Sequence, residues 1–103
     1  MDAVLQAIAE PRRRKILQLV STSELSAGEI ASSFDVTRPA ISQHLTVLRA
    51  AGLVSMRREG TRRIYRARPE ALSEVRAFLD EFWSEGLERL KTAAEQAEKG
   101  HSR

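Results

Sequence analysis

The sequence contains no cysteine, and in 103 residues it has only two histidines, five glycines and three prolines. Without cysteine, disulfide bonds, thiolate zinc sites and cysteine nucleophiles are excluded, and the chain suits a reducing cytoplasm. The two histidines lie far apart, at positions 44 and 101. No nucleophile and base pattern, glycine-rich phosphate loop or cluster of metal ligands accompanies them. The sequence therefore indicates no enzyme and no cofactor.

Long apolar runs are also missing, since no stretch approaches the ~18 residues of a membrane-spanning helix. No charged and then apolar leader opens the chain. We therefore expect a cytoplasmic protein without a membrane partner. With 103 residues, of which 42% are apolar, the chain has the mass for a single domain with one modest core.

Charge is distributed unevenly, although the net charge is only +3. Residues 38–68 contain eight arginines and one acidic residue, Glu59, which gives this segment a net charge of +7. Residues 70–103 contain five basic and eight acidic side chains. A concentrated basic segment favours binding to a polyanion. The alternative is that these charges form a solvated face that serves only solubility.

A short amphipathic helix is predicted over residues 2–9, where Asp2 suits the cap. Val4, Leu5 and Ile8 line one face of this helix. Eight residues do not hold a helix alone in water, so this face must pack on its own domain or on a partner subunit.

A second helix is predicted over residues 11–20, with Pro11 at its first position. The basic run from Arg12 to Lys15 lies at the positive end of this helix, where cations are disfavoured. We expect compensation by local pairing, for example with Glu10, rather than by phosphate contact.

A helix-turn-helix is predicted over residues 26–51. Ser26 and Glu29 form an S-x-x-E capping box that opens a helix ending at Ser33. After a tight turn, Thr37 caps a second helix, and Gly52 supplies its left-handed end.

The second of these helices has two different faces. Ile41, Leu45 and Leu48 fall within roughly 60° on a helical wheel and form a stripe that must be buried. The opposite face carries side chains that are small or uncharged, namely Pro39, Gln43, Thr46 and Ala50. Such a face fits a DNA major groove and can contact base edges. The alternative interpretation is an ordinary surface helix of a small helical bundle.

A β-hairpin with an arginine-rich tip is predicted over residues 53–67. Val54 and Met56 alternate with polar residues, Gly60 lies at a two-residue turn, and Ile64 and Tyr65 suit the return strand. A helix-turn-helix followed by such a hairpin is a winged helix. We expect the arginines at the tip to contact DNA. The alternative is that they only keep the exposed strand edge from pairing with another chain.

The last long helix is predicted over residues 70–97, followed by a disordered tail at 99–103. At 1.5 Å per residue this helix is longer than so small a globule can cover, so its apolar stripe argues for a partner. A symmetric homodimer built from the first and last helices buries both apolar faces. The predicted interface residues are Val4, Leu5, Ile8, Leu72, Val75, Phe78, Leu79, Phe82, Trp83, Leu87 and Leu90. The whole is read as a single winged-helix domain over residues 1–98, mainly α-helical with a small hairpin.

With these motifs the chain resembles the ArsR/SmtB family of bacterial winged-helix repressors. The resemblance rests on A-I-A-E-P-R-R-R-K-I-L at 7–17, E-L-S-A-G-E-I-A at 24–31, T-R-P-A-I-S-Q-H-L-T-V-L-R-A-A-G-L-V at 37–54 and R-R-E-G-T-R-R-I-Y-R at 57–66. It implies a homodimer joined through the first and last helices that binds a palindromic operator in double-stranded DNA. It also implies repression of transcription, often of the protein's own operon.

The metal sites of that family are not matched in this sequence. The segment 24–29, where such sensors place a cysteine motif, contains no thiol, and residues 70–97 contain no histidine. Zinc or soft-metal sensing requires such ligands, so we expect no metal response. A small-molecule inducer is unknown, and an ArsR-type sensor of such a molecule or of an atypical metal stays an alternative. A winged helix that binds a protein is a further alternative.

The leading hypothesis is a sequence-specific DNA-binding repressor. Gln43 suits adenine, Thr46 and Ala40 can touch a thymine methyl group, and His44 has a flanking role. The candidate major-groove residues are Thr37, Arg38, Pro39, Ala40, Ser42, Gln43, His44 and Thr46. The candidate wing residues are Arg57, Arg58, Thr61, Arg62 and Arg63.

Overall fold

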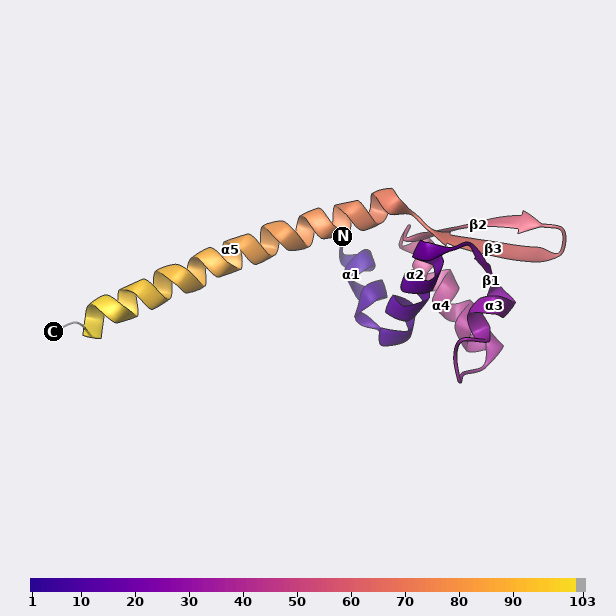
Figure 1. Ribbon diagram of the computed structural model, residues 1–103, viewed down its shortest axis with the longest axis horizontal. Coiled ribbons are helices and arrows are strands. Elements are labelled where there is room, and N and C mark those ends of the chain that lie inside the picture. Colours follow the sequence, from indigo (N-terminus) through magenta and orange to yellow (C-terminus); the bar gives the residue numbers. More distant parts are fainter. Residues whose placement is uncertain (102–103) are drawn as a thin grey trace. The chain divides into compact units, whose positions relative to one another are not determined.

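The computed structural model describes residues 1–101, and it describes side chains through residue 98. Its elements in chain order are α1 (Asp2–Ala9), α2 (Pro11–Thr22), β1 (Leu25–Ser26), α3 (Ala27–Ala31), α4 (Arg38–Ala50), β2 (Val54–Glu59), β3 (Arg62–Ala67) and α5 (Pro69–His101). The mainly α-helical fold with a hairpin and a long last helix is confirmed (Figure 1).

The chain divides into two units, Met1–Leu72 and the helical segment from Ser73 onward. The first unit contains α1 to α4, the strands and the first residues of α5. The assignment of residues 1–98 to one domain stays a prediction.

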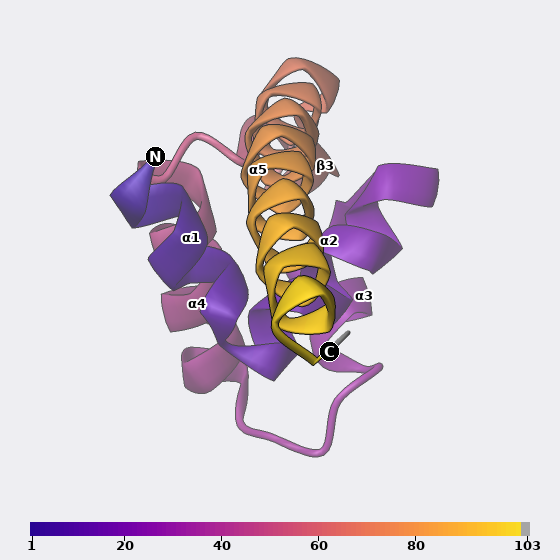
Figure 2. The same ribbon diagram turned by 90° about the vertical axis from the view of Figure 1, so that its left-hand side faces the viewer.

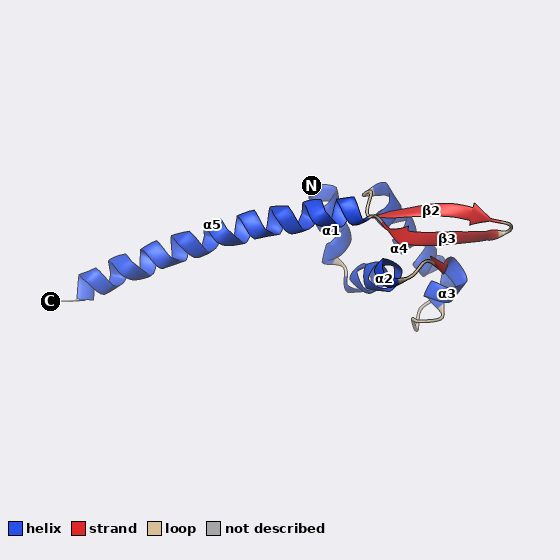
Figure 3. Ribbon diagram, turned by 45° about the horizontal axis from the view of Figure 1, so that its top comes forward, coloured by secondary structure: helices blue, strands red, loops and turns tan. Residues whose placement is uncertain are grey.

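The strands of the first unit form an antiparallel sheet in the order β1-β3-β2. Strands β2 and β3 make the predicted hairpin, with Glu59 opposite Arg62 at its tip (Figure 3). Gly60 adopts a φ of 64° in the two-residue turn, a left-handed value that residues other than glycine rarely adopt. This turn holds the arginines at the ends of both strands at one edge of the unit.

The core of the first unit lies between its helices and the sheet, because α2 contacts β3 and α4 contacts β2. The side chains that are almost fully buried there are Ile16, Ile30, Ile41, Leu45, Leu48 and Leu53. The predicted buried stripe of α4 is therefore confirmed, and it fixes which face of α4 points outward.

The predicted helix-turn-helix is present, but its first helix is shorter than expected and a strand precedes it. Helix α3 ends at Ala31 instead of Ser33, because the amides of Ser33 and Phe34 bond three residues back, to Ile30 and Ala31. An irregular segment then leads to α4 (Figure 2). The strand β1 is only two residues long and pairs Leu25 with Tyr65, so no alternating pattern announces it.

The ends of three other helices differ from expectation. Helix α1 has Met1 at its N-cap without a side-chain hydrogen bond, so the prediction that Asp2 caps it is wrong; Asp2 is its first helical residue. Helix α2 continues to Thr22, and α5 continues to His101, past the predicted end at 97 and into the predicted tail. The last two residues of that tail, 102 and 103, lie outside the described residues.

Candidate nucleic-acid interface

Helix α4 is fixed by its caps and by its buried stripe. The Thr37 hydroxyl accepts the Ala40 amide hydrogen at 3.3 Å, and Gly52 follows the helix with a φ of 78°. With Ile41, Leu45 and Leu48 buried, the opposite side of the helix is directed to solvent. The exposed side chains on that side include Pro39, Gln43, Thr46 and Ala50, as the helical wheel predicts.

Sequence reasoning missed Val47 on this helix. Its side chain is 39% exposed, and it follows Gln43 by one helical turn, so both residues lie on the outward face. Ala40, a predicted contact to a thymine methyl group, is only partly exposed. The spacing of four residues from Gln43 is the signal that could have identified Val47.

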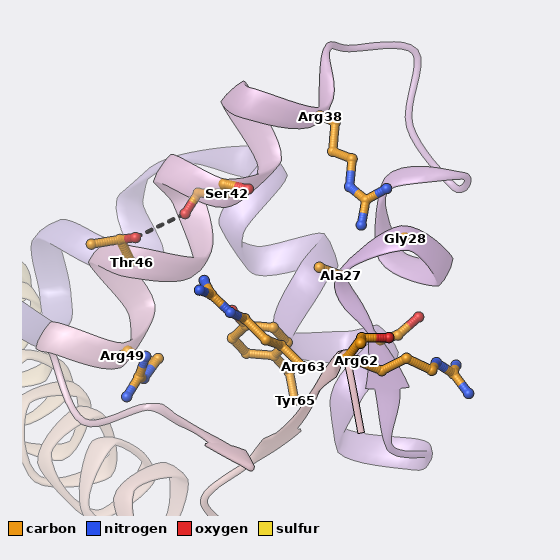
Figure 4. A pocket seen from close by; sticks show the side chains of 11 residues that line it. Ala27, Gly28, Arg38, Ser42, Thr46, Arg49, Arg62, Arg63 and Tyr65 are labelled. Carbon is orange, nitrogen blue, oxygen red and sulfur yellow. Dashed lines mark hydrogen bonds between the residues drawn. The ribbon is translucent and has the colours of Figure 1, made fainter. Parts of the chain in front are cut away.

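A hollow of about 480 Å³ separates α4 from the hairpin, and we call it the α4–wing hollow (Figure 4). It is lined by Ser26, Ala27 and Gly28 at the start of α3, by Arg38, Ser42, Thr46 and Arg49 of α4, and by Thr61, Arg62, Arg63 and Tyr65 of the hairpin. Four of these residues are arginines and none is acidic. The α4–wing hollow is thus a concave basic surface beside the outward face of α4.

The α4 side of this hollow follows from helical spacing. Arg38, Ser42, Thr46 and Arg49 recur at intervals of three or four residues, so they lie along one side of α4. The Thr46 hydroxyl donates to the Ser42 carbonyl at 2.9 Å, which leaves its methyl group toward the surroundings. Arg49 was not among the predicted contacts, although this spacing from Arg38 already places it on the same side.

The wing arginines differ in their partners. Arg57 lies 2.6 Å from Glu24 and 3.1 Å from Glu59, and the hydrogen bond with Glu24 is the main cause of its raised pKa. Arg62 lies 2.6 Å from Glu29. Arg58 and Arg63 form no ion pair with any side chain that the structure describes. Charges that already have a partner are less available to a phosphate.

Arg62 and Arg63 are adjacent in sequence but point in different directions. In the view of Figure 4, Arg63 points toward α4 and Arg62 points away from it. Glu29, which holds Arg62, also closes the predicted capping box: its carboxylate accepts the Ser26 amide at 3.1 Å and its own amide donates to the Ser26 hydroxyl at 3.1 Å. Hydrogen bonding of this carboxyl with the backbone amide of Ser26, then with its side chain and with Arg62, lowers the pKa of the Glu29 carboxyl.

His44 lies on the inner side of α4, away from the outward face. Its Nδ1 is 3.4 Å from Arg13 Nη1 and 3.9 Å from the Glu10 carboxylate, and its side chain is 18% exposed. Of the candidate major-groove residues, His44 is therefore the one whose ring is held by the junction of α1 and α2. Burial acts to raise the pKa of Glu10, but the Arg13 amide and His44 lower it overall.

The basic run at 12–15 is compensated locally, mostly by backbone carbonyls. Arg13 donates to the carbonyls of Ala7 at 2.7 Å and Gln6 at 3.2 Å, and Arg14 donates to those of Ile8 at 2.7 Å and Ala9 at 3.0 Å. Within this run and among the described side chains, it is Arg12 that makes an ion pair with Glu10, at 3.9 Å. The expected pairing with carboxylates is thus largely replaced by bonds to the open C-terminal end of α1.

The predicted interface residues of the first and last helices differ in exposure. Val4, Leu5, Ile8 and Leu72 are partly exposed, and Val75 is buried. The exposed fraction ranges from 37% to 68% for Phe78, Leu79, Phe82, Trp83, Leu87 and Leu90. These six side chains form a long apolar face on α5, and the rings of Phe78 and Phe82 stack at 6.5 Å.

Among the described side chains, no group of three or more His, Cys, Asp or Glu residues is arranged to hold a metal ion. Within the described residues, no helix combines the length and the apolar character that crossing a membrane requires.

Residues 10–56 match the sequence profile of the bacterial regulatory proteins of the arsR family. The HTH-type transcriptional regulator Rv2034 of Mycobacterium tuberculosis is 44% identical over 86 residues, which are 84% of this chain and 80% of that protein. The chain belongs to the ArsR family. It is therefore a DNA-binding transcriptional regulator with a winged helix-turn-helix and not an enzyme.

Two further relatives support the assignment to the ArsR family. The transcriptional repressor SdpR of Bacillus subtilis is 43% identical over 60 residues, covering 58% of this chain and 67% of that protein. A crystal structure described as a possible transcriptional regulator for arsenical resistance aligns with a TM-score of 0.76 and 43% identity, covering 87% of this chain and 93% of the other.

Proposed function

We propose that this ArsR-family protein is a homodimeric repressor that binds a palindromic operator in the cytoplasm. The observation that carries the proposal is that the outward face of α4 lies beside the α4–wing hollow, whose lining contains arginines and no acidic residue. An uncharged face beside a basic hollow suits base edges and phosphates respectively. Repression follows when the bound dimer blocks the polymerase, and the protein's own promoter is one target.

Base recognition is assigned to the outermost side chains of α4. Gln43 can donate to and accept from the adenine edge in the major groove, and Val47 can contact a thymine methyl group. Val47 therefore joins Thr46 and Ala40, to which we assigned the methyl contact from the sequence. Arg38 and Ser42, at the side of the helix, are assigned to phosphates. The same role is assigned to Arg58 and Arg63, the wing arginines without an ion pair among the described side chains.

Dimerisation is assigned to α1 and α5. The exposed apolar side chains of α5, such as Phe82 at 61% and Trp83 at 66%, are large surfaces that a soluble monomer rarely presents side by side. A symmetric pairing buries the same face of both subunits and gives the two α4 helices the symmetry of a palindrome.

The proposed repressor does not respond to metals. Its family includes metal sensors, but this chain has no thiol, and of its two histidines the one at position 44 is engaged with Arg13 and Glu10. A tetrahedral site for zinc or a soft metal needs several convergent ligands of these types. The residues present do not fit such a site.

The proposal is tested by selecting operators from a random duplex library with the full chain and then measuring binding by fluorescence anisotropy. We expect Gln43→Ala to weaken binding to the selected operator by ~1–3 kcal/mol while binding to random duplex stays nearly unchanged. The physical reason is that Gln43 contributes to base edges and carries no charge.

Gln18→Ala is the matched control, because Gln18 is exposed on α2 and undergoes the same chemical change. We expect its affinity for both duplexes to equal that of the wild type. Equal losses on both duplexes for Gln43→Ala would contradict the assignment of α4 to base reading. A library that yields no preferred sequence would contradict sequence-specific binding.

A further inference from the structure

Tyr65 is a buried residue whose hydroxyl forms no hydrogen bond with the residues that the structure describes. Its side chain packs in the core next to β1 and β2, and the residue is 5% exposed. Among the described residues, every side-chain nitrogen or oxygen that is fully shielded from solvent has a hydrogen-bond partner. The Tyr65 hydroxyl has none, so it is not fully shielded. The hydroxyl is therefore in contact with solvent.

We infer that this contact occurs in the α4–wing hollow, because Tyr65 is one of the residues that line it. Residues two apart on a strand share one face, so Tyr65 and Arg63 both face the helices from β3. Figure 4 shows the Tyr65 ring directed toward α4, with Arg63 extending in the same direction. Tyr65 and Arg63 thus border the hollow from the same side, that of the hairpin.

The side chains around this hydroxyl favour an anion. Arg49 and Arg63 contribute charge from opposite sides of the hollow, and neither has an ion pair with a described side chain. No carboxylate lines the hollow. A Tyr hydroxyl can donate one hydrogen bond to an anionic oxygen, and guanidinium groups suit phosphate geometry.

We propose that the α4–wing hollow seats one phosphate of the DNA backbone in each half-site, with the Tyr65 hydroxyl donating to a non-bridging oxygen and with Arg49 and Arg63 flanking it. This inference rests on the proposed function and deepens it. Tyr65 thereby helps to fix the position of α4 along the DNA, because its ring is packed against the strands while its hydroxyl binds the DNA backbone.

The inference is tested with Tyr65→Phe, which keeps the ring and removes only the hydroxyl. Ser55→Ala is the matched control, because it removes a hydroxyl from β2 next to the second, separate hollow that Ile64 and Arg66 line. Binding is measured by anisotropy on the selected operator and on random duplex, over a series of salt concentrations. Thermal unfolding of each variant is recorded as well.

We expect Tyr65→Phe to weaken binding about tenfold on both duplexes, since a phosphate contact is independent of sequence. The slope of binding against salt should stay unchanged, because a neutral donor releases no counterion. The unfolding temperature should not fall, because no internal hydrogen bond is lost. Ser55→Ala should bind like the wild type.

A second readout locates the phosphate by replacing single phosphates of the operator with neutral methylphosphonates. We expect the wild type to lose affinity at one position in each half-site at which Tyr65→Phe shows a smaller loss. If the two proteins respond alike at every position and Tyr65→Phe binds with wild-type affinity, the inference is overturned while the proposed function stands. If the wild type binds neither duplex, both are overturned.

Discussion

At the scale of single residues, the wing arginines are distinguished by their partners and not by their number. Arg57 is held by Glu24 and Glu59, whereas Arg63 borders the α4–wing hollow without an ion pair among the described side chains. A phosphate that recruits Arg57 must first replace a carboxylate. Arg63 has no such contact to lose.

We predict that Arg63→Ala weakens binding to every duplex and lowers the slope of log affinity against log salt by about 0.9, the value for one phosphate contact. Arg57→Ala, the matched control on the same hairpin, should change the slope less, because its charge is already paired. Salt titrations by anisotropy check both. A larger slope change for Arg57→Ala than for Arg63→Ala would contradict this account of the wing.

Glu29 should make stability depend on pH in the acidic range. Its pKa in the folded protein lies below the ordinary 4.5, chiefly through Ser26, so its carboxylate stabilises the fold above that ordinary value. This stabilisation is lost as the pH falls through the lowered pKa. We predict that Glu29→Gln is less stable than the wild type at neutral pH and that the difference shrinks as the pH falls below 4.5.

Chemical denaturation at a series of pH values measures this difference. Glu88→Gln is the control, since Glu88 is exposed on α5 and forms no ion pair with a described side chain. A constant difference between Glu29→Gln and wild type across the acidic range would show that the lost charge is not what stabilises the capping box.

At the scale of elements, Arg13 is one of the side chains that attach α1 to the rest of the first unit. The guanidinium of Arg13 bonds to the carbonyls of Ala7 and Gln6 and approaches His44 of α4. A helix of eight residues depends on such contacts, because it is not stable by itself. Arg13 therefore connects the end of α1 with the inner side of α4.

We predict that Arg13→Ala lowers the free energy of unfolding by ~1–3 kcal/mol, because it leaves polar groups unpaired at the end of α1. Arg12→Ala should change it by less than ~0.5 kcal/mol, since an exposed ion pair contributes little. Denaturant titration measures both, and hydrogen exchange of the α1 amides should accelerate only in Arg13→Ala. Equal exchange in the two variants would contradict the role of Arg13.

The elements that the sequence predicts correctly are those with local signals. Thr37 and Gly52 mark the ends of α4, and Gly60 marks the hairpin turn, so each is readable within a few residues. The strand β1 has no such signal, because Leu25 pairs with Tyr65 far along the chain. It becomes visible only when the fold is complete.

The same distinction applies to the candidate site. The outward face of α4 follows from helical spacing, so Gln43 could be selected from the sequence. Strand alternation already indicates that Arg62 and Arg63 point to opposite faces of the hairpin, but the ion pair of Arg62 with Glu29 of α3 depends on how the elements pack. The position of His44 next to Glu10 likewise depends on how the helices pack.

At the scale of the whole molecule, the two units of the chain suggest a division of labour. The first unit carries α4 and the hairpin, which are assigned to DNA. The helix of the second unit presents large exposed apolar side chains, among them Phe82, Trp83 and Leu90. Pairing of two chains through this helix is proposed to bring two reading helices to one operator.

We predict that Phe82→Glu prevents this pairing, because a buried carboxylate without a partner is costly, while α4 and the hairpin keep their structure. We expect the variant to sediment as a monomer and the wild type to sediment as a dimer. Gln96→Glu, which adds the same charge elsewhere on α5, is the control and should remain dimeric. A Phe82→Glu chain that sediments like the wild type would contradict the assigned interface.

The central claim is that a dimer reads two half-sites with two copies of α4. Hydroxyl-radical footprinting of the wild type on a selected operator tests it most directly. The account predicts two protected stretches of DNA backbone, one per half-site, whose centres lie ~34 Å apart, or a small multiple of that distance, at two chains per operator. A single protected segment with one chain bound would contradict it.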